Sequence, residues 1–355
     1  DFHRDFTNWP LDSTRIARVT SLMIERDAGT FVLQEGQLVF ATPLGGRTVA
    51  AVFTGKGTFS FVPRSEIERQ QLRRFYGTPT LRVPVQQLVL FFSDSTAAEL
   101  REGLTFAPDT ARSLQRAWRS AFPYLTVPRT KFVRPLSLAQ MLVDGDDNGY
   151  FRAMINPGRG GEPMFFSLDP TFTERVRLER RPRDDRYGLK RHYGSETLSQ
   201  CFALGDPDTL RRDMNPPYEA SHYETDLVLD SGLGITATAE VSVVAHGRAR
   251  GWIGFDLPEH LKVDSLVCAG RTVTYLQEPE NDLVWARVSP PIEAGETAVF
   301  RVRYHGIAFE RRDDFIWHRD LLGWFPRPIY AGASTWDMRF THPRDYQLVA
   351  AGRRD

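Results

Sequence analysis

ITATAEVSVV, residues 235–244, alternates apolar and polar side chains over most of its length. In an extended chain one face carries Ile235, Ala237, Ala239, Val241 and Val243, and the other carries Thr236, Thr238, Glu240 and Ser242. Successive side chains of a β-strand point to opposite faces, so this alternation is typical of a strand that is covered on one side only. The stretch predicts a sheet with one face on a core and the other in water.

The same alternation recurs on both sides of this stretch. It appears in HYETDLVLD (222–230), TAVFRVRY (297–304) and TWDMRFT (335–341). Turn signals rich in Gly, Asp and Asn separate the runs at 230–232, 269–271, 280–282 and 293–295. Short strands that are separated by turns at regular intervals predict a β-sandwich over residues 218–355.

Residues 1–205 also predict strands. Apolar runs rich in Val, Phe and Thr lie at 29–34, 37–42, 47–54 and 57–62. These residue types favour extended chains. The glycine-containing stretches Gly55–Thr58 and Asn156–Pro163 lack the spacing of phosphate-binding loops, so we predict hairpin turns there.

Two or three short helices interrupt the strands of this first part. Ser65 and Glu68 form a capping box ahead of EIERQQLRRFY, and Gly77 is the predicted stop. A second helix is predicted in DTARSLQRAWRSAF (109–122) from its apolar stripe, and a third, shorter one over 137–143. The predicted fold class is mainly β: two β-rich domains, with the few helices in the first.

A polar segment with two prolines separates the two parts. GDPDTLRRDMNPP spans 205–217 and ends in Pro216-Pro217, which neither a helix nor a central strand accepts. We therefore predict domains at 1–205 and 218–355, joined by a linker at 206–217.

Composition argues against several classes of partner. Lys and Arg total 45 and so do Asp and Glu, so no net field favours nucleic acid. The longest apolar run, at 85–92, is far shorter than the roughly 20 residues of a membrane-spanning helix. Residue 1 is Asp and not Met, which fits a processed, exported protein. We therefore expect a periplasmic or other extracytoplasmic location. Peripheral contact with a membrane is compatible with that location.

The two cysteines, Cys201 and Cys268, leave two alternatives open. They can form one disulfide, or both can remain free thiols. Cys268 shares the face of Leu266 in an alternating run, which favours a free buried thiol at that position.

No catalytic motif is present in the sequence. The eight His include no H-E-x-x-H pair of the kind that binds zinc on one helical turn. Gly332–Thr335 lacks the second glycine of a nucleophile elbow. We therefore expect no enzymatic activity, no catalytic residue and no cofactor in this chain.

One short motif has some character of a metal site. Asp144, Asp146 and Asn148, followed by Gly149, match the first half of a calcium loop that supplies oxygen ligands at alternate positions. Position 12 of that loop is Ile155, where a bidentate Glu is needed. Asp, Asn and Gly are equally the residues of a solvated turn, which is the favoured interpretation.

A basic segment lies between Glu174 and Gly194. It could bind an anionic partner or lipid headgroups. Val176 and Leu178 alternate with charged residues, however, and this pattern favours an exposed hairpin with one solvated face.

The second part resembles the N-terminal domain of the M1 family of zinc aminopeptidases, the gluzincins. The resemblance rests on HYETDLVLD (222–230), HLKVDSLVCAGRTVTY (260–275), PPIEAGETAVFRVRYHG (290–306) and GWFPRPIYAGASTWDMRFTHPRDYQLVAAGR (323–353). Residues 1–205 are similar to an additional β-rich region found in a less typical bacterial branch of that family.

The resemblance implies a fold and not an activity. In such enzymes the catalytic domain follows the point where this sequence stops, so we expect this chain to lack it. The loop DLLGWFPRPIYAG (320–332) also departs from the family pattern, so no substrate-anchoring residue can be carried over.

Aromatic residues concentrate near the C-terminal end of the chain. The candidates for a partner interface are Phe315, Trp317, Trp324, Phe325 and Tyr330. Loops run over the surface, so we expect several of these rings to be exposed and Trp324 to anchor a protein partner, against the alternative of a small cluster packed under the loop.

The resulting hypothesis is a non-catalytic, exported β module that serves as a structural or interaction subunit, with a periplasm-facing membrane complex as one setting. The alternative is the N-terminal part of a longer M1-like metallopeptidase.

Overall fold

The computed structural model describes residues 9–109, 112–121, 136–145, 149–181, 196–204, 216–277, 283–318, 323–330, 332–349 and 353. The chain divides into two compact units, Asp1–Asn215 and Pro216–Asp355, which we call unit 1 and unit 2. Both consist mainly of strands, and the helices with given bounds all belong to unit 1, so the predicted fold class is confirmed. The predicted linker, 206–217, lies outside the described residues except for its two prolines.

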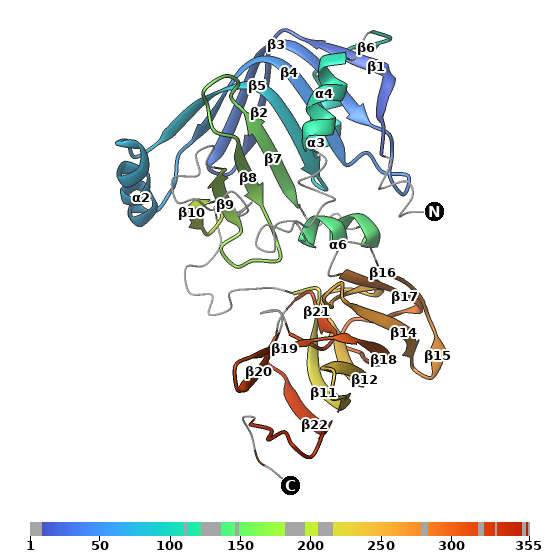
Figure 1. The fold of residues 1–355 in the computed structure, drawn as a ribbon. Helices are drawn as coiled ribbons and strands as arrows, with labels where there is room; N and C mark the ends of the chain where they lie inside the picture. Colours follow the sequence, from blue (N-terminus) through green and yellow to red (C-terminus); the bar gives the residue numbers. More distant parts are fainter. Residues whose placement is uncertain are drawn as a thin grey trace. The chain divides into compact units, whose positions relative to one another are not determined.

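Ten strands of unit 1 form one sheet, in the order β10-β9-β8-β7-β5-β4-β3-β1-β6, with β2 paired to β3 (Figure 1). Their bounds are Leu11–Val19 (β1), Leu22–Arg26 (β2), Gly29–Ala41 (β3), Ala50–Phe61 (β4), Leu81–Phe92 (β5), Phe106–Ala107 (β6), Phe151–Asn156 (β7), Met164–Leu168 (β8), Val176–Arg180 (β9) and Glu196–Cys201 (β10). The pairings within this sheet are antiparallel.

Strands β3 and β4 are longer than the sequence predicted because each continues through a glycine. Gly36 pairs with Gly55, and a Cβ added at Gly55 would lie 2.1 Å from the carbonyl oxygen of Glu35. Only glycine allows the two backbones to approach this closely. The predicted hairpin turn at Gly55–Thr58 is therefore wrong, whereas the one at Asn156–Pro163 does connect β7 to β8.

The helices of unit 1 are α2 (Glu66–Tyr76), α3 (Thr96–Glu102), α4 (Arg112–Ala121) and α6 (Leu136–Asp144). Three of them confirm predicted helices. The hydroxyl of Ser65 accepts a hydrogen bond from the N–H of Glu68 at 3.1 Å, and Gly77 ends α2 in the left-handed conformation with φ of 73°. The sequence analysis missed α3.

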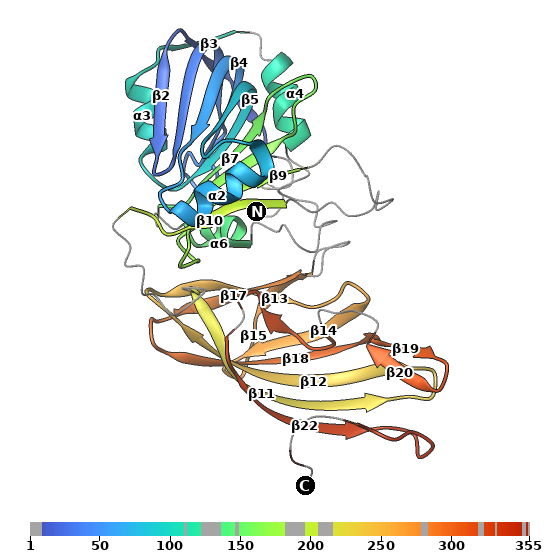
Figure 2. The ribbon, with the colours of Figure 1, turned by 90° about the vertical axis from the view of Figure 1, so that its left-hand side faces the viewer.

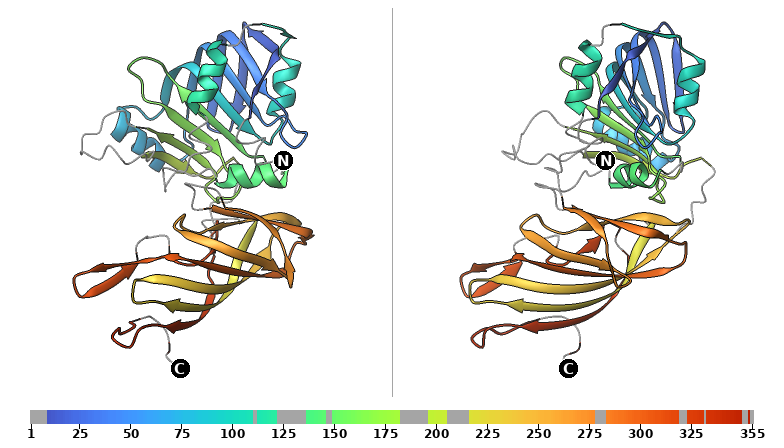
Figure 3. Two further views of the ribbon diagram at one scale, coloured as in Figure 1. Left: turned by 45° about the vertical axis from the view of Figure 1, so that its right-hand side comes forward. Right: turned by 90° about the vertical axis from the view of Figure 1, so that its right-hand side faces the viewer.

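Helices cover both faces of the sheet in unit 1. Leu72 of α2 and Leu100 of α3 are buried in one apolar cluster. Leu114 and Trp118 of α4 and Met141 of α6 are buried in another, on the opposite face. Figures 2 and 3 show α3 and α4 on opposite sides of the strands. The sheet therefore lies between two apolar layers.

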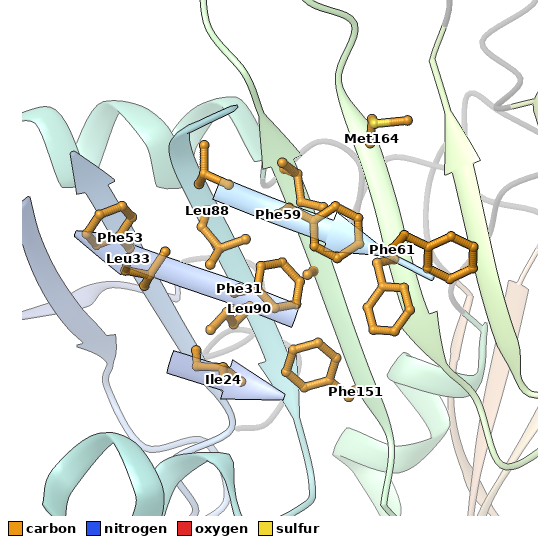
Figure 4. Close-up of a cluster of buried hydrophobic side chains, with 14 of the residues drawn as sticks. Ile24, Phe31, Leu33, Phe53, Phe59, Phe61, Leu88, Leu90, Phe151 and Met164 are labelled. Atoms are coloured by element: carbon orange, nitrogen blue, oxygen red, sulfur yellow. The ribbon is translucent and has the colours of Figure 1, made fainter. Parts of the chain in front are cut away.

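The larger apolar layer is rich in phenylalanine. Figure 4 shows its rings and aliphatic side chains gathered on one side of the strands. The ring of Phe31 lies 4.7 Å from that of Phe59 and 6.1 Å from that of Phe166, measured between centroids. Aromatic rings bury a large apolar area each, and this layer accounts for much of the hydrophobic stabilisation of unit 1.

Unit 2 contains two sheets and a separate hairpin. The six-stranded sheet has the order β15-β14-β18-β12-β11-β22, the four-stranded sheet has the order β16-β17-β13-β21, and β19 pairs with β20. The bounds are Tyr218–Leu229 (β11), Gly234–Ala245 (β12), Arg250–Asp256 (β13), Leu261–Cys268 (β14), Arg271–Thr272 (β15), Thr274–Gln277 (β16), Leu283–Ile292 (β17), Thr297–Ile307 (β18), Phe309–Arg312 (β19), Phe315–His318 (β20), Arg327–Pro328 (β21) and Thr335–Thr341 (β22).

The two sheets of unit 2 pack face to face. The predicted inner face of β12 is buried, and its polar face is partly or fully exposed. The ring of Phe255 on β13 meets that of Phe300 on β18 at 5.2 Å between centroids. The hydroxyl of Tyr218 on β11 accepts a hydrogen bond at 2.8 Å from the N–H of Gly254 on β13. Side chains of both sheets thus form one core, as in a β-sandwich.

The two cysteines belong to different units. Both are free and buried, so the disulfide alternative is not realised and the free buried thiol at Cys268 is confirmed. Burial raises the pKa of the Cys201 thiol to about 12 and also raises that of Cys268. The thiol is the less reactive form, so these groups behave as small apolar side chains.

Candidate partner-binding surface

Neither a metal cluster nor a membrane-spanning helix is found in the described residues. There, no group of three or more His, Cys, Asp and Glu is arranged to hold a metal ion. Helices of the described part are all too short or too polar to cross a membrane.

The weak calcium motif is only partly described. Asp144 lies at the end of α6, and one of its carboxylate oxygens accepts a hydrogen bond from Nε2 of Gln140 at 2.7 Å. Asp146 and Asn148 lie outside the described residues. Calcium binding at this motif stays a prediction.

The basic segment begins in a hairpin, as predicted, but its first strand is buried. β9 pairs antiparallel with β10. Val176, Leu178 and Glu179 are all buried: the first two belong to the larger apolar cluster, and Glu179 lies 3.5 Å from Nη2 of Arg152. The expectation of a solvated face is wrong for β9, and residues 182–195 of the segment lie outside the described residues.

The aromatic candidates separate into a buried group and an exposed group. Trp324 is 6% exposed and Tyr330 is 3% exposed. Phe325 is half-buried. The expectation that Trp324 and Tyr330 offer exposed rings to a partner is wrong, and the alternative of a packed cluster under the loop holds for them.

The buried group packs on the edge of the six-stranded sheet. Trp336 of β22 and Tyr223 of β11 are paired residues in parallel strands, and their rings stack at 3.9 Å with an interplanar angle of 9°. The ring of Phe325 stands edge-on to Trp336 at 4.3 Å, and Trp324 contacts Phe340 of β22 at 5.3 Å. Residues 323–330 therefore cover the inner face of the edge strand. We call Tyr223, Trp324, Phe325, Trp336 and Phe340 the buried aromatic cluster; Tyr223 and Trp324 are buried, and the other three side chains are half-buried.

Burial of this cluster affects the ionisation of its tyrosine. Tyr223 is 2% exposed, and burial raises the pKa of its phenol. The neutral form is favoured because a phenolate would lose its hydration there.

The exposed group lies on the hairpin formed by β19 and β20. Phe315 is 66% exposed and Trp317 is 56% exposed, the largest exposures among the aromatic candidates. Alternate residues of a strand share a face, so both rings project from the same side of β20. Their centroids are 6.2 Å apart with an angle of 64° between the ring planes. We call Phe315 and Trp317 the hairpin aromatic pair.

The opposite face of the hairpin is tied to the rest of unit 2. Arg311 pairs with Ile316 across the hairpin, so these two side chains share the face away from the aromatic pair. Nη2 of Arg311 donates a hydrogen bond at 3.1 Å to the hydroxyl of Tyr346, and its guanidinium lies 5.7 Å from the centre of that ring. The hydroxyl of Tyr346 in turn donates at 3.3 Å to the carbonyl of Ser231, in the turn between β11 and β12. One face is anchored and the other presents the aromatic pair.

Charges frame the hairpin aromatic pair. Phe315 pairs with Arg312 across the hairpin, and Trp317 pairs with Glu310. The turn itself consists of Asp313, with φ of 53°, and Asp314, both exposed. Two aspartates at the tip disfavour insertion into an anionic lipid surface. Aromatic rings with charged side chains around them are typical of protein interfaces.

A loop was predicted for this segment, and the hairpin was not predicted from the sequence. The available signal was Asp313-Asp314 as a turn, followed by three consecutive residues that favour strands, Phe315, Ile316 and Trp317. The short length of the strands, four residues each, hid that signal.

Comparisons with known proteins leave the family of this chain open. No family model matches the sequence, and no curated protein sequence matches it. Among solved structures, an M1 zinc metallopeptidase from Deinococcus radiodurans aligns with 18% identity and a TM-score of 0.32, over 36% of this chain and 33% of that chain. A two-domain M1 zinc metallopeptidase variant bound to L-arginine aligns with 16% identity and a TM-score of 0.33, over 40% of this chain and 38% of that one.

The matched region is about a third of the length of these metallopeptidases. They belong to the family that the sequence resembles. At this identity and TM-score the likeness does not bear on the activity, substrates or partners of this chain.

Proposed function

We propose that this chain is a non-catalytic β module that binds a protein partner through the hairpin aromatic pair. The observation that carries the proposal is the exposure of Phe315 and Trp317 on one face of a hairpin whose other face is anchored by Arg311 and Tyr346. Large aromatic side chains held in a fixed position supply much of the binding energy of protein interfaces, since they lose little conformational freedom on association.

The experiment that tests this proposal is quantitative capture from native extract of the source cells. The bait is the full chain, compared with a variant carrying Phe315→Ala and Trp317→Ala. We expect the double variant to lose at least about tenfold of one specifically captured protein, the loss typical of removing an interface anchor.

A matched control keeps this experiment specific. Val228 is an exposed apolar residue of β11, 52% exposed, on the outer face of the six-stranded sheet. Val228→Ala should leave capture unchanged. Equal recovery of every protein by wild type and double variant, with both chains folded by circular dichroism, would exclude the hairpin as the docking surface.

The proposal includes action outside the cytoplasm. Cell fractionation of the native organism, with an antibody against this chain, tests that part. Recovery in the cytoplasmic fraction alone would exclude a location outside the cytoplasm. It would not affect the proposal that the hairpin aromatic pair binds a protein partner.

The second candidate function is that of the N-terminal part of a longer M1-like zinc metallopeptidase. It is supported by the sequence resemblance of 218–354 to the N-terminal domain of that family. The intact mass of the native protein tests it: a mass well above the 40.5 kDa of this sequence favours the longer enzyme.

A further inference from the structure

Strand β22 is the longest edge strand among the described strands of unit 2. Among the described strands of unit 2, it ends the six-stranded sheet and pairs only with β11. The other sheet edges of this unit are short: β15 and β21 have two residues each and β16 has four, against seven in β22. Short edge strands are a common protection against pairing with another chain. β22 lacks that protection, and it contains no proline.

The residue types of β22 are arranged symmetrically about the centre of the strand. It reads TWDMRFT, with Met338 at the centre. On either side of Met338 stand Asp337 and Arg339, which carry opposite charges; beyond them stand two aromatic residues, Trp336 and Phe340, and then two threonines, Thr335 and Thr341.

An antiparallel copy of the same strand would be complementary to β22 at every position. With Met338 opposite Met338 of a second copy, Asp337 lies opposite Arg339 and Arg339 opposite Asp337 of that copy. Each aromatic residue then meets the other aromatic type, and each threonine meets a threonine. A two-fold axis produces such reciprocal contacts between identical chains. Opposite charges and aromatic side chains that face each other across a strand pair are stabilising.

We propose that two copies of this chain associate through β22, which pair antiparallel about Met338 and join their six-stranded sheets into one. The backbone N–H and C=O groups on the outer edge of β22 then form a ladder, as in other cases of strand addition.

Charge selects this register over its neighbours. Sliding the pairing by two residues in either direction places Asp337 opposite Asp337 of the second copy, or Arg339 opposite Arg339. Like charges that face each other across strands are destabilising. A shift by one residue puts Asp337 opposite Met338. The aromatic side chains of one strand would then lie on the same face of the sheet as the charged side chains of the other. The proposed register is the one that satisfies both faces.

The two charged side chains are accessible for this contact. The side chain of Asp337 is 82% exposed and that of Arg339 is 79% exposed. Within the chain, Arg339 lies 3.3 Å from Asp226 and Asp337 lies 3.7 Å from Nε2 of His222. Exposed pairs of this kind are weak, so they do not hold the side chains away from a second copy.

Sedimentation velocity of the full chain, over a range of concentrations, tests the proposal. We expect a reversible dimer with a Kd on the order of 100 µM or tighter, since the contact is a single strand pair with flanking side chains. A wild-type chain that stays monomeric up to about 1 mM, ten times that Kd, would overturn the proposal.

Charge variants identify the surface. Asp337→Arg alone and Arg339→Asp alone each turn two attractive pairs into two repulsive pairs, so each should weaken the dimer at least about tenfold. The combined variant restores opposite charges in every pair and should dimerise as the wild type does. An equimolar mixture of the two single variants should also form mixed dimers, because each then faces its opposite.

Matched controls exclude a general charge effect. Glu240 and Arg301 form an ion pair of 3.6 Å on β12 and β18, away from the sheet edge. Glu240→Arg and Arg301→Asp make the same changes of charge and should leave the Kd of the dimer unaltered. A dimer that responds equally to both sets, or is not restored by mixing, contradicts the assignment to β22. The double variant at Phe315 and Trp317 should dimerise normally, so this result is independent of the proposed partner surface.

Discussion

Trp324 of the buried aromatic cluster and Trp317 of the hairpin aromatic pair come from one short stretch of sequence and have opposite environments. Trp317 and Trp324 are seven positions apart, yet the first is 56% exposed and the second 6% exposed. Each of the two tryptophans has a phenylalanine within two positions, Phe315 and Phe325. Composition therefore does not decide which tryptophan is available to a partner.

Placement relative to the sheet makes the difference. Trp324 has the edge strand β22 beneath it, with Phe340 at 5.3 Å, and Phe325 beside it at 5.5 Å. Trp317 lies on a hairpin that belongs to neither sheet, and Figure 2 draws this hairpin as an arm beside the six-stranded sheet. Phe315 is its ring neighbour at 6.2 Å. A ring is buried where a sheet face is available to cover it.

The largest expected effect comes from Trp324→Ala. Removing a buried tryptophan leaves a cavity that neighbouring rings fill only in part, so we expect a loss of about 3–5 kcal/mol in the free energy of unfolding of unit 2. Native-state hydrogen exchange of peptides from β11 and β22 measures the change in that unit alone.

Trp324→Phe is the control for this prediction, since it keeps an aromatic ring in the cluster, and it should be less destabilising than the alanine variant. If exchange from β11 and β22 is as slow in Trp324→Ala as in the wild type, the cluster does not stabilise unit 2.

A smaller effect is expected from alkaline pH. Burial raises the pKa of Tyr223, and of Tyr304 in the same core, above that of an unfolded tyrosine, near 10. The native state keeps these protons while the unfolded state releases them, so stability is fully present below about pH 10 and falls as the pH rises further. Each buried tyrosine contributes a slope approaching about 1.4 kcal/mol per pH unit.

Tyr223→Phe sharpens this prediction because it removes one titrating group from the cluster. Urea unfolding of the full chain between pH 8 and pH 11 should show a shallower alkaline decline in the variant than in the wild type. Identical slopes would mean that the phenol of Tyr223 is hydrated in the native state.

The smallest effect is expected for the hairpin aromatic pair in the isolated chain. Phe315→Ala and Trp317→Ala remove exposed rings, so the free energy of unfolding should change by no more than about 0.5 kcal/mol for each. Trp317→Ala and Trp324→Ala are the same chemical change in the two environments. A loss of several kcal/mol from Trp317→Ala would mean that this ring is structural and would remove the contrast between the two regions.

Much of unit 2 could be predicted from the sequence because its strands are buried on one face. The alternation of Ile235 to Val243 and of Phe300 to Tyr304 matches the observed burial. A period of two residues follows directly from strand geometry and needs no knowledge of the partner strand.

What the sequence did not predict depends on contacts between distant segments. The continuity of β4 through Gly55 depends on Gly36 of the neighbouring strand. The burial of Trp324 depends on the parallel pairing of β22 with β11, more than one hundred residues away. α3 is held by Arg26 of β2, which bonds Asp94 at 2.7 Å and Glu99 at 2.9 Å. Short-range patterns do not report such pairings.

Photo-crosslinking from the position of Trp317 tests the central claim most directly. A photoreactive phenylalanine analogue replaces Trp317 in one sample of the full chain and Val228 in a matched sample, and both are irradiated in native extract. We expect position 317 to form a discrete covalent adduct with one partner protein, identified by mass spectrometry, and position 228 to form none. Adducts of equal yield from both positions, or none from position 317, would contradict the claim that the hairpin aromatic pair binds a partner.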